Sequence, residues 1–254
     1  MLLEGKIAII TGASQGIGAA FAEGFARQGS YIVVADIADG EKAVGKVEQV
    51  GSKAIYVKTD VTDFDSCKNM AQIAIERFGR VDILLNNAAM YANIIKKSFV
   101  EISTDEWNRV MEVNTAGPFN CAKAVFPYMK GKGGKIINVS SSSIFEGPPG
   151  MPHYVASKGA VWAFTRSLAR ELGAHNITVN SLAPGYTQSE GSKRIEKNRT
   201  TVGPSPEEIS IQRRCLKRSA LPEDMVGVAI FLGSHLSDFI TGQLILCDGG
   251  ASYN

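Results

Sequence analysis

Residues 6–18 read KIAIITGASQGIG, a run that passes from apolar, β-branched residues into a glycine-rich loop. The apolar part, Lys6 to Thr11, has the length and composition of a strand that is buried on both faces. The glycines permit a tight turn, after which a helix is predicted from about Gly16 to Gly29. A buried strand, a glycine loop and a helix in this order predict the first unit of a parallel sheet covered by helices.

The same alternation continues along the rest of the chain. Short apolar runs alternate with stretches of helical periodicity, including one long predicted helix that Pro118 would bend. We therefore expect an α/β fold with a single domain over residues 1–254, a Rossmann-type doubly wound parallel sheet with helices on both faces. The further predicted strands are Tyr31–Asp36, Ala54–Lys58, Val81–Leu85, Lys135–Val139, Ile177–Leu182 and Gln243–Cys247, and the further helices start near Glu41 or span Ser66–Phe78, Glu106–Met129, Tyr154–Leu172 and Pro222–Leu232.

Composition and charge argue against several classes of protein. A chain of 254 residues that is 44% hydrophobic can build the core of one domain. The net charge of +2 is too balanced for electrostatic binding to nucleic acid or a membrane surface. No apolar run approaches the ~18–20 residues of a membrane span, and the first residues lack the apolar region of a signal peptide. Four widely spaced cysteines argue against a metal site, and we expect a cytoplasmic protein.

The glycine loop has the chemistry of a phosphate-binding site. A pyrophosphate can approach a glycine backbone closely, and the N-terminus of the following helix supplies free N–H groups and a positive dipole end. The alternative is a plain turn between strand and helix, because 26 glycines make chance spacings common. The order of strand, loop, helix and second strand favours a dinucleotide site. The contacts expected from this loop come from Gly12, Ser14, Gln15, Gly16, Ile17 and Gly18.

Asp36 ends the second predicted strand and indicates which dinucleotide the site prefers. A carboxylate at this place can accept hydrogen bonds from the adenosine ribose hydroxyls and would repel a 2′-phosphate. Its neighbours Ala35 and Ile37 are not basic, so nothing beside it would hold such a phosphate. NAD is therefore favoured over NADP, the alternative for Asp36 being a solvated residue at a strand end.

Tyr154 and Lys158 lie four residues apart at the start of a predicted helix, so they share one face. A tyrosine hydroxyl, with a pKa near ~10, is a poor base at neutral pH unless a cation stabilises the phenolate. A nearby ammonium would do so and would let Tyr154 exchange a proton with a substrate hydroxyl or carbonyl. Alone, this spacing can arise by chance, since the chain holds seven tyrosines and 27 lysines and arginines.

Taken together, the motifs resemble the short-chain dehydrogenase/reductase family over essentially the whole chain. The resemblance implies that Tyr154 is the catalytic acid/base, that Lys158 lowers its pKa and binds the nicotinamide ribose, and that Ser141 holds the substrate oxygen. Three flanking serines leave the last assignment open, although strand alternation points Ser140 and Ser142 the other way. The other motifs that occur in the family's order are Asp60-Val61, Asn86-Asn87-Ala88-Ala89, Asn114, Ser140–Ser143 and Pro184-Gly185.

The resemblance also implies further cofactor contacts. Asn114 would position a water behind Lys158, Asp60 and Val61 would flank the adenine, and Asn87 would stabilise the sheet beside the cofactor. The remaining expected contacts are Pro184, Gly185, Thr187 and Ser189.

Two positions depart from the family pattern. Ala89 stands where the family usually has glycine, which would narrow the cofactor cleft slightly. Ser189 stands where the family has threonine, and its hydroxyl can still bond the nicotinamide carboxamide.

The substrate pocket that the resemblance implies is mostly apolar or aromatic and carries no permanent charge. Such walls favour a ring or alkyl chain and offer no partner to a carboxylate near the reacting carbon. We therefore expect oxidation of a neutral, hydrophobic secondary alcohol of 1-phenylethanol type to its ketone. For one of these residues, His153, solvent is the alternative environment. The implied residues are Met90, Tyr91, Ile144, Phe145, Met151, His153 and Tyr186.

Residues 187–218 fall where the family places a substrate lid, and they are rich in basic side chains. One interpretation is a docking surface for the anionic handle of a 3-hydroxyacyl thioester, which is the rival substrate. The other interpretation is a solvated loop. The basic residues are Lys193, Arg194, Lys197, Arg199, Arg213, Arg214, Lys217 and Arg218.

Two expectations concern the protein as a whole. A non-enzymatic NAD-binding sensor would show a degenerate site, whereas Asn114, Ser141, Tyr154 and Lys158 are all present, which favours an enzyme. The resemblance also implies a homotetramer, in which the two long helices pair between subunits and the C-terminal strand completes the assembly.

Overall fold

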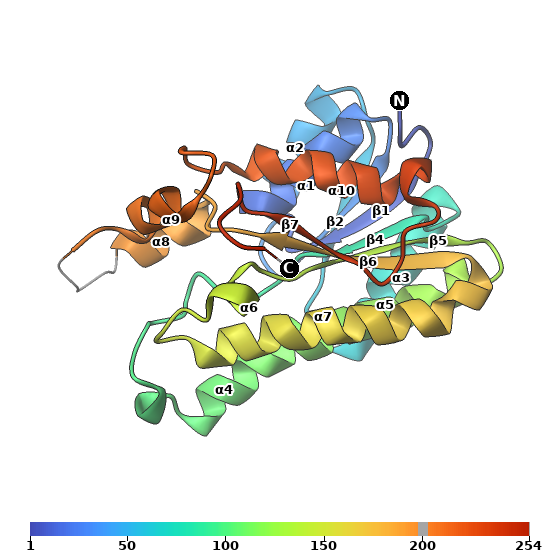
Figure 1. The fold of residues 1–254 in the computed structure, drawn as a ribbon. Coiled ribbons are helices and arrows are strands. Elements are labelled where there is room, and N and C mark those ends of the chain that lie inside the picture. The colour runs from blue at the N-terminus through green and yellow to red at the C-terminus, as the bar shows by residue number, and fades with distance from the viewer. Residues whose placement is uncertain (198–202, 254) are drawn as a thin grey trace.

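The structure is a computed structural model that describes residues 1–197 and 203–253. Within these ranges the strands form one sheet in the order β3-β2-β1-β4-β5-β6-β7 (Figure 1). Every pair of neighbours is parallel, so the predicted doubly wound fold is confirmed. The strands are β1 (Ile7–Thr11), β2 (Tyr31–Asp36), β3 (Ala54–Lys58), β4 (Ile83–Asn86), β5 (Gly134–Val139), β6 (Ile177–Pro184) and β7 (Leu244–Cys247).

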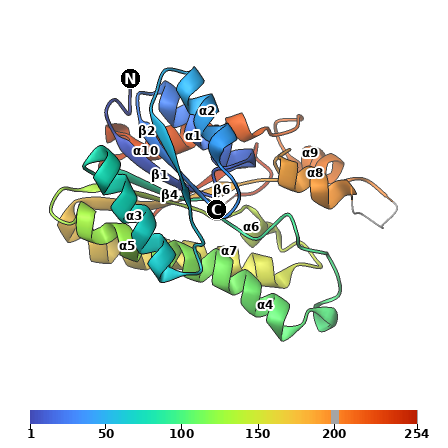
Figure 2. The same ribbon diagram turned by 180° about the vertical axis from the view of Figure 1, so that it is seen from behind.

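Helices cover both faces of this sheet. They are α1 (Gly16–Arg27), α2 (Glu41–Gln49), α3 (Phe64–Phe78), α4 (Thr104–Met111), α5 (Gly117–Met129), α6 (Ser143–Glu146), α7 (Pro152–Leu172), α8 (Glu190–Lys197), α9 (Pro206–Arg213) and α10 (Val226–Gly233). Helices α1, α2 and α10 lie on one face, and α3, α5 and α7 lie on the other (Figures 1 and 2). Phe21 and Phe25 are fully buried in the first layer and Met70 and Met129 in the second. Burial on both sides explains why the strands are continuous apolar runs.

The strand order reverses between β1 and β4, and this reversal positions the site. In open parallel sheets, ligands bind outside the carboxyl ends of the strands where the order reverses. The glycine loop follows β1, and Asn87 follows β4. Ser140 follows β5 and Gly185 follows β6, so the motif residues lie at the carboxyl edge of four neighbouring strands.

The long helix predicted over Glu106–Met129 is interrupted. Helices α4 and α5 are separated by a π-helical turn over Glu112–Ala116, while Pro118 lies within the first turn of α5. Single π turns inside helices are rare overall, and those that occur are often found at functional sites. The interruption therefore precedes Pro118 and contains Asn114.

The region between β6 and β7 differs most from the expected pattern. Helices α8 and α9 project from the body of the molecule, beside the carboxyl edge of the sheet (Figure 1). The helix predicted to begin at Pro222 starts as a 3₁₀ turn over Pro222–Met225 and continues as α10. In the described part of the chain, no helix combines the length and the hydropathy needed to cross a bilayer.

Candidate active site

The glycine loop packs tightly against the end of β4. A Cβ at Gly12 would lie 2.8 Å from the Cα of Ala88, and one at Gly18 would lie 2.1 Å from the carbonyl oxygen of Gly12. The side chain of Asn87 donates hydrogen bonds of 3.0 Å to the carbonyls of Thr11 and Gly12. Asn87 thus ties the loop to the central strands, and both glycines are required sterically.

Asp36 lies beside the same loop. Its Oδ2 accepts a hydrogen bond of 2.9 Å from the backbone N–H of Ser14, and its Oδ1 accepts one of 3.0 Å from Ala38. Asp60, beyond β3, accepts two hydrogen bonds from Thr62, and these lower the pKa of its carboxyl group. The carboxylate of Asp36 is therefore held in place at the edge of the glycine loop.

Tyr154 and Lys158 occupy successive turns of α7, and both are buried. The Nζ of Lys158 donates a hydrogen bond of 2.8 Å to the carbonyl of Val139 and lies 5.8 Å from the centroid of the Tyr154 ring. The hydroxyl of Ser140 donates to the carbonyl of Lys158 at 2.8 Å. The end of β5 thereby fixes the pair relative to the sheet.

In the protein alone, burial is the main influence on the pKa values of Tyr154 and Lys158. It raises the pKa of Tyr154 to about 12, while the side-chain hydrogen bond of Ser141 acts in the lowering direction. Burial also lowers the pKa of Lys158 to about 8. For Tyr154, desolvation outweighs the hydrogen bond of Ser141, so its pKa lies above the ordinary value. The lowering by Lys158 that the family resemblance implies stays a prediction.

The serines that follow β5 differ in their hydrogen-bond partners. Ser141 accepts the backbone N–H of Ser143 at 3.2 Å and hydrogen-bonds to Tyr154. Ser140 and Ser142 instead donate to oxygens of neighbouring residues. Of these three hydroxyls, that of Ser141 is therefore the one in contact with the tyrosine.

Asn114, at the centre of the π turn, links three segments. Its Oδ1 accepts the backbone N–H of Met90 at 2.7 Å, and its Nδ2 donates to the hydroxyl of Ser157 at 3.0 Å. The same Nδ2 lies 3.3 Å from the carbonyl of Met90. The side chain thus joins the segment after β4 to α7, one residue before Lys158.

A cavity of about 610 Å³ joins the glycine loop to Tyr154 and Lys158 and extends to helices α8 and α9. Three of the expected substrate residues, Tyr91, Met151 and Tyr186, lie in its wall. Its lining residues include Gln15–Gly18, Asn87, Ala89, Tyr91, Lys96, Val139–Ser143, Glu146, Met151, Tyr154, Lys158, Pro184–Thr187, Ser189, Pro206, Ile209, Ser210 and Arg213.

Four of the expected substrate residues do not line this cavity: Met90, Ile144, Phe145 and His153. Phe145 packs on Trp162, with 5.8 Å between ring centroids. Met90 packs against the apolar cluster that contains Tyr154. His153 is only 4% exposed, its pKa is lowered by burial, and its Nδ1 has no partner among the described residues.

The charged side chains of Lys96 and Glu146 in the cavity wall are the main feature that sequence reasoning missed, whereas Arg213 belongs to the basic segment named there. Lys96, Glu146 and Arg213 line it, so its walls are not uncharged throughout. Residues 206, 209, 210 and 213 of α9 have the spacing of one helix face, and that periodicity was the available signal.

Several basic residues of the segment between β6 and α10 are engaged in bonds within the chain. Arg214 is 2% exposed and donates to the carbonyls of Tyr186 and Arg218. Arg213 forms an ion pair with Glu146, and Lys217 donates to a backbone carbonyl. Arg199 lies among residues 198–202, outside the described residues. The bond of Arg213 to Glu146 joins the segment between β6 and α10 to α6, whereas the bonds of Arg214 and of Lys217 lie within that segment.

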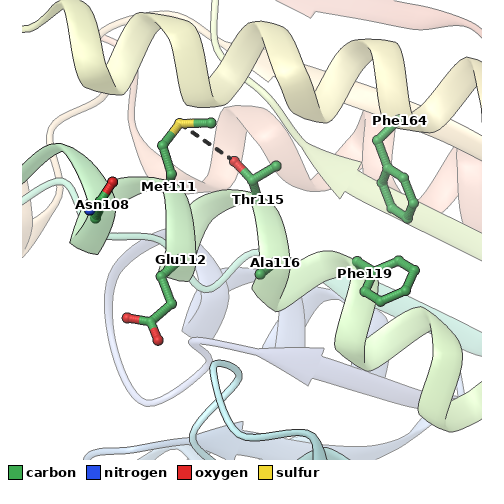
Figure 3. Close-up of a pocket in the computed structure, with 7 residues that line it drawn as sticks. All are labelled: Asn108, Met111, Glu112, Thr115, Ala116, Phe119 and Phe164. Atoms are coloured by element: carbon green, nitrogen blue, oxygen red, sulfur yellow. Dashed lines mark hydrogen bonds between the residues drawn. The ribbon is translucent and has the colours of Figure 1, made fainter.

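A second hollow, of about 580 Å³, is lined by residues of α4, α5, α7 and the π turn (Figure 3). It shares no lining residue with the first cavity. Phe119 is 49% exposed there and packs edge-on against Phe164, with 6.3 Å between ring centroids. The residues that line it are Asn108, Met111, Glu112, Thr115, Ala116, Phe119 and Phe164. Among the described residues, no three His, Cys, Asp or Glu side chains gather as metal ligands would.

Comparison with known proteins gives consistent matches over the whole chain. A family model described as "Enoyl-(Acyl carrier protein) reductase" matches residues 12–252. A 3-oxoacyl-[acyl-carrier-protein] reductase of Thermotoga maritima is 36% identical, covering 98% of this chain and 99% of the relative. A 2-dehydro-3-deoxy-D-gluconate 5-dehydrogenase of Dickeya dadantii is also 36% identical, covering 98% and 96%. A short chain dehydrogenase from Mycobacterium paratuberculosis, solved bound to NAD, superposes with a TM-score of 0.87 at 29% identity and 99% coverage of both chains.

Proposed function

From the premise that this chain belongs to the short-chain dehydrogenase/reductase family, we propose that it transfers a hydride between NAD(H) and a secondary alcohol or its ketone. The observation that carries the proposal is the single cavity in which the glycine loop, Ser141, Tyr154 and Lys158 meet. The relatives named as dehydrogenases and the NAD-bound structural neighbour support a nicotinamide cofactor and alcohol–ketone chemistry. An assay of NADH absorbance with a panel of secondary alcohols tests the reaction class.

The residues present fit a dinucleotide. Gly12 and Gly18 leave no room for a Cβ, so the loop is compact, and the N-terminus of α1 opens on the cavity. The loop would hold the diphosphate, Asp36 the adenosine ribose, and Lys158 the nicotinamide ribose. Asp60 and Val61 would flank the adenine, while Pro184, Gly185, Thr187 and Ser189 would contact the nicotinamide. When bound, NAD supplies the hydride acceptor, and NADH the hydride donor.

The proton would move at the hydroxyl of Tyr154. With a pKa raised by burial, this hydroxyl is held in the acid form, which suits protonation of a ketone oxygen. In the oxidative direction the phenolate must form, and the nearest ammonium that stabilises it belongs to Lys158. Ser141 would hold the substrate oxygen beside Tyr154. The side chain of Asn114 is engaged with Met90 and Ser157, so its backbone carbonyl would be the group that meets a water.

Two substrate classes deserve a test within this reaction. Tyr91 and Met151 form an apolar wall near Tyr154 that would accept an aryl alcohol of 1-phenylethanol type. Such a substrate would make no polar contact with Glu146 and Arg213 in the wall of the cavity. The rival is a 3-hydroxyacyl thioester, supported by the 3-oxoacyl-[acyl-carrier-protein] reductase relative, although Arg213, Arg214 and Lys217 are engaged within the chain.

We expect kcat/KM with NAD to exceed that with NADP by about 10²-fold, because a hydrogen bond to a charged group is worth about 1.5–3 kcal/mol. The carboxylate of Asp36 would bind the ribose hydroxyl of the first and repel the phosphate of the second. Asp36→Arg should reverse the preference. Asp36→Asn keeps an acceptor for the N–H of Ser14 and should only weaken it. Equal or better kcat/KM of the wild type with NADP would contradict the assignment.

We also propose a homotetramer, in which the helical face that carries the second hollow meets a second copy. The half-exposed Phe119 would be buried there, and β7, the last strand of the sheet, offers an unpaired edge for the other contact. Light scattering should give four times the mass of one chain. Phe119→Asp should reduce this mass, whereas a wild-type protein with the mass of a single chain would contradict the proposal.

The proposed location is the cytoplasm. Cys67 and Cys121 are free and buried, with 3.7 Å between their sulfur atoms, and a reducing compartment keeps such neighbouring thiols unpaired. No partner other than small molecules and copies of the chain is proposed.

A further inference from the structure

We infer that the cavity wall formed by α6 and α9 is a hydroxyl-binding subsite, and that the substrate is a polyhydroxylated secondary alcohol. The inference rests on the proposed function and names its substrate class. It is carried by one unpartnered hydroxyl and by a loosely paired carboxylate and guanidinium in the same wall.

The unpartnered hydroxyl belongs to Ser143. This residue is 9% exposed and lines the cavity, and its Oγ has no hydrogen-bond partner among the described residues. Buried hydroxyls in folded proteins are nearly always paired. A ligand group in the cavity beside it would become the partner of this buried hydroxyl.

Glu146 and Arg213 provide an acceptor and a donor beside it. Glu146 lies three residues after Ser143 on α6 and thus on the same side of that turn. Its Oε1 accepts the hydroxyl of Ser142 at 2.6 Å, and its Oε2 lies 3.4 Å from an Nη of Arg213. This long contact engages one of the five N–H groups of the guanidinium. The side chains of Glu146 and Arg213 are 26% and 56% exposed, so both are within reach of a ligand in the cavity.

Helix α9 adds a further hydroxyl to this wall. Ser210 lies one turn before Arg213, and both line the cavity together with Ile209 and Pro206. The wall therefore combines a carboxylate that accepts, a guanidinium that donates and serine hydroxyls that do both.

This mixture fits neutral hydroxyl groups better than other ligands. A hydroxyl both donates and accepts, so it can bridge Glu146 and Arg213. A site for a bare anion would present donors, whereas Glu146 would repel a carboxylate or phosphate. A purely apolar substrate would leave the hydroxyl of Ser143 without a partner and would cover polar atoms of Glu146 and Arg213 that could bind further groups, which is costly.

The test compares kcat/KM for NAD reduction with hexitols (sorbitol, mannitol and galactitol), 2-hexanol, 1-phenylethanol, D-gluconate and a 3-hydroxyacyl thioester. We expect the best hexitol to exceed 2-hexanol by about 10²-fold, because a site built to bond a hydroxyl strongly rejects an analogue that lacks it. Glu146→Gln and Ser143→Ala should each lower the hexitol to 2-hexanol ratio about tenfold or more. Glu76→Gln, the same change on the exposed face of α3, should leave the ratio unchanged.

The inference is overturned if 1-phenylethanol, 2-hexanol or the thioester equals or exceeds every hexitol, or if neither Glu146→Gln nor Ser143→Ala changes the ratio. It is also overturned if kcat/KM with D-gluconate exceeds kcat/KM with every hexitol by more than about tenfold. Such a factor corresponds to one added hydrogen bond to a charged group. Absence of NADH formation with any of these alcohols would contradict the proposed function itself and is thus distinguishable from failure of the subsite.

Discussion

Replacing Tyr154 with phenylalanine should lower kcat by about 10²–10⁴-fold, the contribution of a positioned proton-transfer group. The hydroxyl is buried and hydrogen-bonded to Ser141, so its loss removes the proton donor without altering the ring packing on Tyr91, whose centroid lies 5.1 Å away. NADH affinity, measured by fluorescence titration, should stay close to that of the wild type.

Tyr91→Phe is the matched control for this change. Tyr91 lines the same cavity, and burial keeps its hydroxyl protonated, yet the proposal gives that hydroxyl no proton to transfer. Its removal should therefore affect kcat far less than removal of the Tyr154 hydroxyl. A Tyr154→Phe enzyme that retains about a tenth of wild-type kcat would show that the acid/base is another group.

Replacing Lys158 with methionine should lower kcat/KM for alcohol oxidation by about 10²-fold or more and should move its rise to higher pH. The variant lacks the cation that stabilises the phenolate of Tyr154, so deprotonation needs a more alkaline solution. In the wild type, burial lowers the pKa of Lys158 from 10.5 to about 8, so the supporting charge is lost above about pH 8. The pH profile of oxidation should accordingly flatten above that pH.

The lowered pKa of Lys158 also predicts how the stability of the folded protein changes with pH. Because the folded-state pKa of Lys158 lies below its unfolded value, the unfolded chain binds more protons between about pH 8 and 10.5, and stability increases with pH across this window. Lys158→Met should abolish that contribution while retaining the fold, as measured by thermal unfolding. An unshifted pH–rate profile in a folded variant would contradict the role of Lys158.

The sheet could be predicted because its signals are local. The strands at Tyr31–Asp36 and Ala54–Lys58 have the predicted bounds, since each is an apolar run flanked by turn residues. The π turn at Glu112–Ala116 could not be predicted, because it depends on tertiary hydrogen bonds. Asn114 bonds to Met90 and to Ser157, and no local pattern indicates either partner.

The same distinction between local signals and long-range contacts applies to the candidate site. Tyr154 and Lys158 meet because a helix places residues four apart on one face, which spacing alone predicts. Glu146 and Arg213 meet across 67 residues of chain, and nothing in the sequence around either indicates the contact. Consecutive residues of a helix point in different directions. The single turn of α6 therefore places Glu146 in the wall of the cavity and Phe145 outside it.

The most direct test of hydride transfer uses the best substrate of the panel with deuterium on its carbinol carbon. Mass spectrometry should find that deuterium in the NADH that wild-type enzyme forms, in a one-to-one ratio with the ketone, and little product of either kind with Tyr154→Phe. Ketone that accumulates while the NADH carries no deuterium, or an enzyme that binds NADH and turns over no alcohol or ketone, would contradict the account.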